Sequence, residues 1–212
     1  MKKKYYMLIG LAVLLILAAG SVFYIRKRPQ KGVEVTPSSV NELPQVVYYR
    51  QKDSRWRDDH LGASRFQMGG SGCLTSCIAS ALSIQAGQGS GHSSYTPGEL
   101  NQLFTDNGVY NESGDIMWNQ IENALPGISV EVETSVSSGR IDQWLQQGIY
   151  PLAKVKNNGS GAIHWVLITG SKTDGYFCMD PLREGEEPVS LSVHGSKVYS
   201  LRAVYWNDAA LN

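Results

Sequence analysis

The sequence has few cysteines and no pattern typical of metal ligands. Its three cysteines, Cys73, Cys77 and Cys178, do not make a disulfide framework for a chain of 212 residues. Because their number is odd, at least one thiol is expected to be free. The four histidines are scattered and lack the spacing of zinc ligands. We therefore expect no metal and no other cofactor, and any special chemistry should come from a thiol.

Positive charge is scarce beyond the N-terminal segment. Seven of the 19 lysines and arginines lie in residues 1–31, which leaves 12 against 19 acidic side chains and a formal charge of −7 for the rest. Proteins that bind nucleic acid need a basic surface, so nucleic acid is excluded as an expected partner. Internal repeats and low-complexity tracts are also missing, and nothing in the sequence indicates an oligomeric state.

One long uncharged run is present, from Tyr5 to Ile25, preceded by three lysines. Its length is about that needed to cross a bilayer as a helix, so residues 1–31 are expected to be a membrane anchor. Ala18-Ala19-Gly20 would also suit cleavage of a signal peptide. Basic residues flank both ends of the run, so the positive-inside rule leaves its orientation open. The basic start favours export, and we expect a bacterial single-pass protein of the cell membrane with an extracytoplasmic domain.

The remaining chain reads as a linker followed by one domain. Glycine, proline and serine in residues 32–45 predict a short flexible linker, and residues 46–212 have the length of one domain. Most helical patterns precede most strand patterns, which predicts an α+β domain with a mainly antiparallel sheet. Helices are expected at 73–86 (ended by Gly87), 96–108, 115–125 and 138–147, and strands at 128–132, 150–156, 162–171, 175–180, 189–193 and 197–206.

Cys73 lies where a nucleophile would be useful. It follows a stretch predicted to be a flexible glycine-rich loop, Met68–Gly72, and opens the predicted helix. The unpaired N–H groups and the positive dipole end of a helix N-terminus favour thiolate, the nucleophilic form. The glycines would let a substrate approach closely. Most cysteines, however, are small buried packing groups, so Cys73 needs partners before it can be assigned a reaction.

A reactive thiol requires a base and a group that orients the base. His60, His92 and His194 fall in polar loops or turns and are interpreted as solvated. His164 instead begins the predicted strand 162–171 and points into the interior near one strand end, where a packed core histidine is the alternative. Asp180 ends the next strand and could hold the His164 tautomer that leaves its other nitrogen facing sulfur, although Asp-Pro also starts ordinary turns.

The order of several motifs resembles the papain-like cysteine peptidases related to the bacteriocin-leader (double-glycine) peptidases. The motifs are Gln51-Lys52-Asp53-Ser54-Arg55-Trp56, Leu61-Gly62, Gly72-Cys73, Thr96-Pro97, His164-Trp165-Val166 and Asp180-Pro181, and they span about residues 46–206. The resemblance implies a papain-like fold with Cys73 as nucleophile, His164 as base, Asp180 as its orienting group and Gln51 as a donor in the oxyanion hole. The Cys73 amide would be the second donor.

The chain departs from that family in two ways. Relatives commonly read Gly-Cys-Gly-Pro-Thr, whereas this chain has Leu74 directly after the nucleophile, and the leucine side chain is expected to narrow the cleft. The leader peptidases are also fused to an export ATPase that this sequence lacks, so leader processing is not the expected reaction. We expect a membrane-anchored cysteine peptidase that hydrolyses peptide or protein substrates. A peptidoglycan amidase or endopeptidase and a catalytically silent peptide-binding module remain the alternatives.

Overall fold

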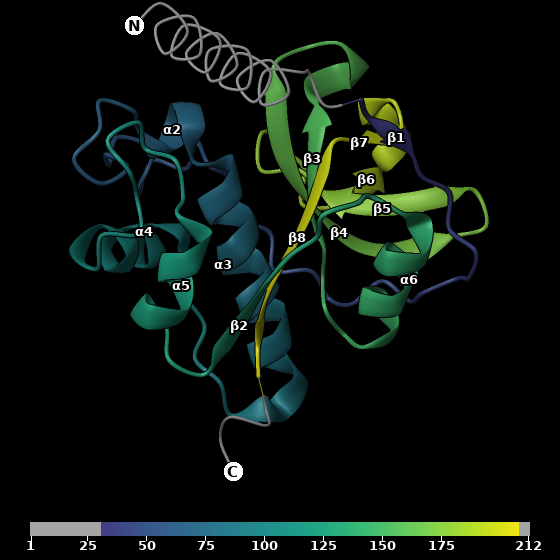
Figure 1. Ribbon diagram of the computed structural model, residues 1–212, viewed down its shortest axis with the longest axis horizontal. Helices are drawn as coiled ribbons and strands as arrows, with labels where there is room; N and C mark the ends of the chain where they lie inside the picture. The colour runs from purple at the N-terminus through teal and green to yellow at the C-terminus, as the bar shows by residue number, and fades with distance from the viewer. Residues whose placement is uncertain (1–30, 208–212) are drawn as a thin grey trace, which may run out of the picture. The chain divides into compact units, whose positions relative to one another are not determined.

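The computed structural model describes residues 31–207 (Figure 1). The apolar run predicted as a membrane anchor, residues 5–25, lies outside the described residues. Within residues 31–207, every helix is too short or too polar to cross a bilayer. The compact unit begins at Gly32. Its described part is mixed α+β with a mainly antiparallel sheet, as the sequence predicts.

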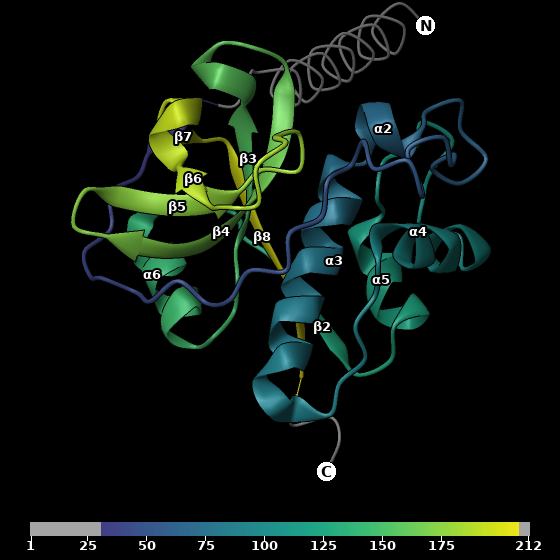
Figure 2. The ribbon, with the colours of Figure 1, turned by 180° about the vertical axis from the view of Figure 1, so that it is seen from behind.

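Most of the helices lie together on one side of the domain, and most of the strands lie on the other (Figures 1 and 2). This group contains α2 (Met68–Ser71), α3 (Cys73–Gln85), α4 (Pro97–Asp106) and α5 (Trp118–Ala124), whereas α6 (Ser138–Gln146) lies with the sheet. Helix α4 starts at the predicted capping box, in which the Thr96 side chain accepts from the Glu99 amide and the Glu99 carboxylate accepts from the Thr96 amide.

Helix α3 is the central element of the domain. Residues Thr75 to Ile84 are all buried, because this helix carries small or apolar side chains around most of its circumference. It packs against strands β4 (Ile163–Lys172) and β8 (Ser200–Trp206) of the sheet. The chain continues as a π-helical turn, Ala86–Ser90, and leaves the helix at Gly91, which has a φ of 72°. The prediction that Gly87 ends this helix is therefore wrong, since the left-handed position falls at Gly91.

One six-stranded antiparallel sheet has the order β2-β8-β3-β4-β5-β6, and a second pair joins β1 to β7. The strands are β1 (Val33–Glu34), β2 (Ile128–Val132), β3 (Leu152–Lys156), β4 (Ile163–Lys172), β5 (Gly175–Met179), β6 (Val189–Ser190), β7 (Lys197–Val198) and β8 (Ser200–Trp206). The last two predicted strands are each interrupted. Strand β6 gives way to a 3-10 helix, η3 (Leu191–His194), and β7 is separated from β8 at Tyr199.

The segment predicted as a flexible linker, residues 32–45, is instead packed on the domain. Val35 is buried after the β1 pairing, Ser38 donates to the Asp142 carboxylate from both its amide and its hydroxyl, and Asn41 pairs with Ser171. Gly170 leaves room for this segment, because a Cβ there would lie 3.0 Å from the Asn41 carbonyl oxygen. The short polar side chains that suggested a linker form specific hydrogen bonds with α6 and β4.

Candidate active site

Cys73 is the first residue of α3, and its side chain is partly exposed. The stretch before it, expected to be a loop, forms the short helix α2, and Gly72 joins the two helices. Gly72 has a φ of −82°, so a left-handed conformation is not what requires glycine there. A Cβ at this position would lie 2.6 Å from the Met68 carbonyl oxygen. Glycine at position 72 therefore allows α2 and the first turn of α3 to approach closely, and this approach sets the position of the thiol.

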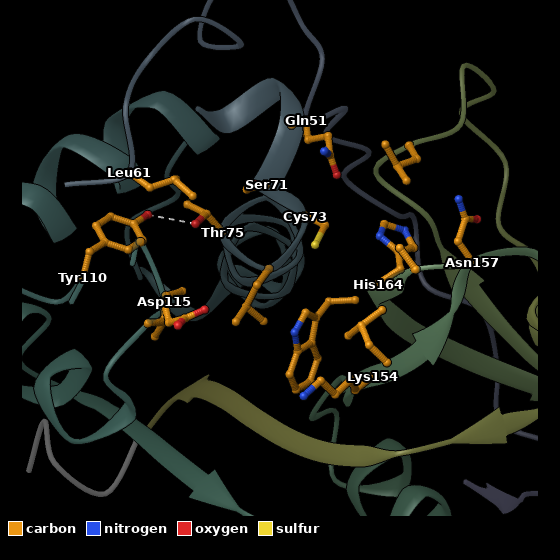
Figure 3. Close-up of a pocket in the computed structure, with 18 residues that line it drawn as sticks. Gln51, Leu61, Ser71, Cys73, Thr75, Tyr110, Asp115, Lys154, Asn157 and His164 are labelled. Carbon is orange, nitrogen blue, oxygen red and sulfur yellow. Dashed lines mark hydrogen bonds between the residues drawn. The ribbon is translucent and has the colours of Figure 1, made fainter. Parts of the chain in front are cut away.

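His164 is the second residue of β4 and is only 3% exposed. Its Nε2 donates to Asp180 Oδ1 at 2.6 Å, so the other ring nitrogen, Nδ1, is left for a different partner. The Cys73 side chain lies near enough to this imidazole to help raise its pKa. Figure 3 shows the Cys73 thiol and the His164 ring both facing the cleft. The structure therefore brings together the thiol, the imidazole and the carboxylate that the sequence singled out.

Asp180 follows directly after β5, whose end lies beside the middle of β4, where Met179 pairs with Leu167. Its Oδ1 also accepts from the Leu182 amide at 2.9 Å, and its backbone carbonyl accepts from the Tyr48 hydroxyl at 2.7 Å. Burial alone would raise the pKa of Asp180. Contacts from His164, His194 and the Leu182 amide outweigh burial and hold this pKa well below its ordinary value, so the carboxylate is charged.

The charge of Asp180 controls the protonation of His164. Burial opposes a charge on the imidazole, but the hydrogen bond to Asp180 and the nearby Cys73 outweigh it and raise the pKa of His164 to about 9. The imidazole is therefore protonated at neutral pH and loses its proton as the pH rises through about 9. A proton held beside a thiol is what a general acid needs to expel an amine.

An Asp180→Asn variant should lower the pKa of His164. Asparagine keeps an oxygen that can accept from Nε2 but removes the negative charge. Less then offsets the effect of burial, which disfavours the protonated imidazole. We expect the midpoint of the His164 titration to move from about pH 9 to a lower pH. An NMR titration of His164 in both proteins measures this shift. The same midpoint in both proteins would show that Asp180 does not control the protonation of His164.

Gln51 lies at the edge of the same cleft and is 2% exposed. Its Nε2 donates to the Gly69 carbonyl at 3.0 Å, which fixes the amide orientation, while Oε1 has no hydrogen-bond partner in the described chain. Its backbone N–H donates to Pro181 at 3.0 Å and so connects it to the segment that carries Asp180. Nε2 has a second hydrogen, and the role of Gln51 as an oxyanion donor stays a prediction.

A cleft of about 390 Å³ opens beside Cys73. Figure 3 shows Leu61, Tyr110 and Asp115 on one side of it and His164, Asn157 and Lys154 on the other. The Tyr110 hydroxyl and the Thr75 side chain are 2.8 Å apart, which fixes one wall. Leu74 also lines this cleft, as expected from its position after the nucleophile. The lining combines apolar surface with polar groups of both charges, and it lies open to solvent.

The other two cysteines differ from Cys73 in burial. All three are free thiols, but Cys77 and Cys178 are completely buried. Burial raises the pKa of both, and nearby Cys73 and Asp180 add to the effect at Cys77. Both should therefore be unreactive. In the described part of the chain, no group of three or more His, Cys, Asp or Glu side chains is arranged to hold a metal ion.

The prediction that His194 is a solvated loop residue is wrong. His194 ends η3, is 1% exposed, and places its Nε2 at 3.5 Å from Asp180 Oδ2. Sequence reasoning missed it because a polar His-Gly-Ser turn does not reveal which side chain faces inward. Of the remaining histidines, His60 is exposed with Nδ1 2.9 Å from the Ser64 carbonyl, and His92 is half-buried and stacks on Trp206.

Comparison with known proteins adds no relative. A scan against protein-family models finds no match for the chain, and a search of curated proteins finds no significant match either. The site therefore has to be interpreted from its own geometry.

Proposed function

We propose that this protein is a cysteine peptidase of papain-like fold, anchored in the bacterial cell membrane with its catalytic domain outside the cytoplasm. The observation that carries the catalytic part is the row of Cys73, His164 and Asp180 at the edge of an open cleft, in which His164 is hydrogen-bonded to Asp180 and lies near the Cys73 thiol. The thiol is partly exposed, whereas His164 and Asp180 are buried. This is expected of a nucleophile that must reach a substrate and of a base and carboxylate that support it. The membrane attachment rests on the apolar run 5–25 in the sequence.

The reaction begins when the Cys73 thiolate attacks the carbonyl carbon of a peptide bond. The His164 imidazolium then gives its proton to the leaving amine, and a thioester to Cys73 remains. Neutral His164 next takes a proton from water as the water attacks the thioester, which releases the acid product and restores the imidazolium. Asp180 keeps its charge throughout and stabilises the protonated form of His164.

The oxyanion formed in each step needs donors beside Cys73. The Cys73 backbone N–H at the start of α3 and the second N–H of Gln51 are assigned this role. The proposal requires the substrate carbonyl to enter between these two groups, at the end of the cleft where Gln51 lies above the thiol (Figure 3).

Incubation of the purified full-length chain with unfolded casein and with peptidoglycan tests the proposal. New peptide amino termini from casein, dependent on Cys73, would support a peptidase that accepts proteins. Release of amino groups only from peptidoglycan would instead assign a cell-wall amidase or endopeptidase. If neither substrate is cut, and peptides bind without being cleaved, the protein is a silent binding module and the proposal is wrong.

A further inference from the structure

A second histidine lies beside the catalytic carboxylate. His194 Nε2 lies 3.5 Å from Asp180 Oδ2, on the carboxylate oxygen that His164 does not use. The two imidazole rings have centroids 6.0 Å apart and flank Asp180. Oδ1 accepts from both His164 and the Leu182 amide, whereas His194 is the group placed at Oδ2. The carboxylate is thus bounded by an imidazole at each oxygen.

His194 is unusual among the buried polar side chains because neither ring nitrogen has a hydrogen-bond partner in the described chain. Leaving a buried donor or acceptor unpaired costs about 1–3 kcal/mol, so such groups are uncommon without a role. The 3.5 Å separation from Asp180 Oδ2 is long for a hydrogen bond. Hydrogen bonds in an empty active site are often long and shorten when the substrate is bound.

The fold holds His194 firmly in this position. Helix η3 is started by the Ser190 side chain, which accepts from the Ser192 amide, and it ends at Gly195 with a φ of 79°. Gly195 in turn lies against the backbone of Gly159 in η2 (Asn157–Gly159). A Cβ atom added to residue 195 would lie 3.4 Å from the Gly159 Cα. The imidazole is therefore placed by two short helices in contact, next to the cleft wall that contains Asn157.

We propose that His194 is a positioning residue whose Nε2–H holds Oδ2 of Asp180 and keeps Oδ1 on His164. The proposal rests on the proposed function, because it concerns the same carboxylate. The titratable groups that face His194 are Asp180 from the end of β5 and His164 from β4, and η2 contributes no titratable side chain. No other charge in the described chain contacts the imidazole, so its effect acts through Asp180.

Removing the donor should change how tightly Asp180 holds the His164 proton. A carboxylate that loses one of its donors is less stabilised as an anion and becomes a stronger base. His164 would then keep its proton to a higher pH. A side chain that only fills space would affect folding stability and leave this titration where it is.

Three variants of the full-length chain separate these possibilities. His194→Leu removes the donor, His194→Gln keeps an amide donor, and Leu191→Ala loosens the same η3 helix without contacting Asp180. The four histidines, labelled with ¹⁵N, would be titrated by NMR, which also reports their tautomers. We expect the His164 midpoint to rise by about half a unit or more in His194→Leu, which is roughly threefold in proton affinity. His194→Gln should shift it less, and Leu191→Ala should leave it unchanged while lowering the melting temperature.

Two results would overturn the proposal. One is a His164 midpoint in His194→Leu that is unchanged, lowered or equal to that of His194→Gln. The other, which needs no variant to fold, is a wild-type His194 in the Nδ1–H tautomer, since Nε2 would then have no proton for Asp180. Neither measurement uses a substrate. A failure to cleave casein would therefore count against the proposed function and leave the test of His194 intact.

Discussion

Replacing Cys73 with alanine should reduce the rate of casein cleavage by about 10⁴-fold or more. The thiol supplies the nucleophile that attacks the peptide bond, and losing the nucleophile of such a constellation removes nearly all catalysis apart from what binding and the oxyanion hole provide. Because Cys73 is partly exposed at the first position of α3, its truncation should leave the fold intact. The initial rate of appearance of new amino termini, with circular dichroism as a check on folding, measures the effect.

Cys77→Ser is the matched control for this variant. Cys77 lies one helical turn further along α3, is fully buried, and its Sγ donates to the Trp165 carbonyl at 3.5 Å. Serine keeps that donor in a similar volume, so cleavage should remain within a few-fold of wild type. Equal loss of activity in Cys73→Ala and Cys77→Ser would mean that the thiols matter for packing and not for chemistry.

Replacing His164 with alanine should lower casein cleavage by about 10²- to 10⁴-fold, which is the usual contribution of a positioned acid–base group. The imidazole both stabilises the thiolate and protonates the leaving amine, and its removal leaves Asp180 buried without its main partner. A cavity of the shape of an imidazole also remains between the thiol and the carboxylate. Added imidazole is therefore expected to restore part of the rate, in proportion to its concentration.

His60→Ala is the control for the His164 variant. His60 is exposed and is not among the described residues that line the cleft. Its replacement should leave the rate within about twofold of wild type and should give no response to imidazole, as is usual for surface substitutions. If the two variants lose activity equally, His164 is not the base.

Periodicity and turn residues were sufficient to predict the α+β class and most of the helices and strands. The capping box at Thr96 and the alternation in residues 128–132 gave the correct element types because they depend on local contacts alone. Errors arose where distant segments decide the outcome. Residues 32–45 pack against α6 and β4, which no local pattern reveals, and the strand expected at 189–193 turns into η3 after Ser190.

In the candidate site, too, residues placed by local sequence patterns were predictable and residues placed by distant contacts were not. Cys73, His164 and Asp180 were predictable because each lies at the end of an element whose type can be inferred from its neighbours. His194 was not, because its side chain points inward from a polar turn only when η3 contacts η2. The orientation of Gln51 was also beyond prediction, since it depends on a hydrogen bond to the Gly69 carbonyl.

Thiol alkylation of the purified chain tests the central claim most directly, because it reads the state of Cys73 without any substrate. Iodoacetamide should label Cys73 far faster than Cys77 or Cys178, whose burial raises the pKa of each thiol. We predict that Cys73 still reacts quickly below neutral pH, and that His164→Ala removes this advantage. If Cys73 reacts no faster than an ordinary exposed thiol, and His164→Ala leaves its rate unchanged, the account of a cysteine nucleophile activated by His164 is contradicted.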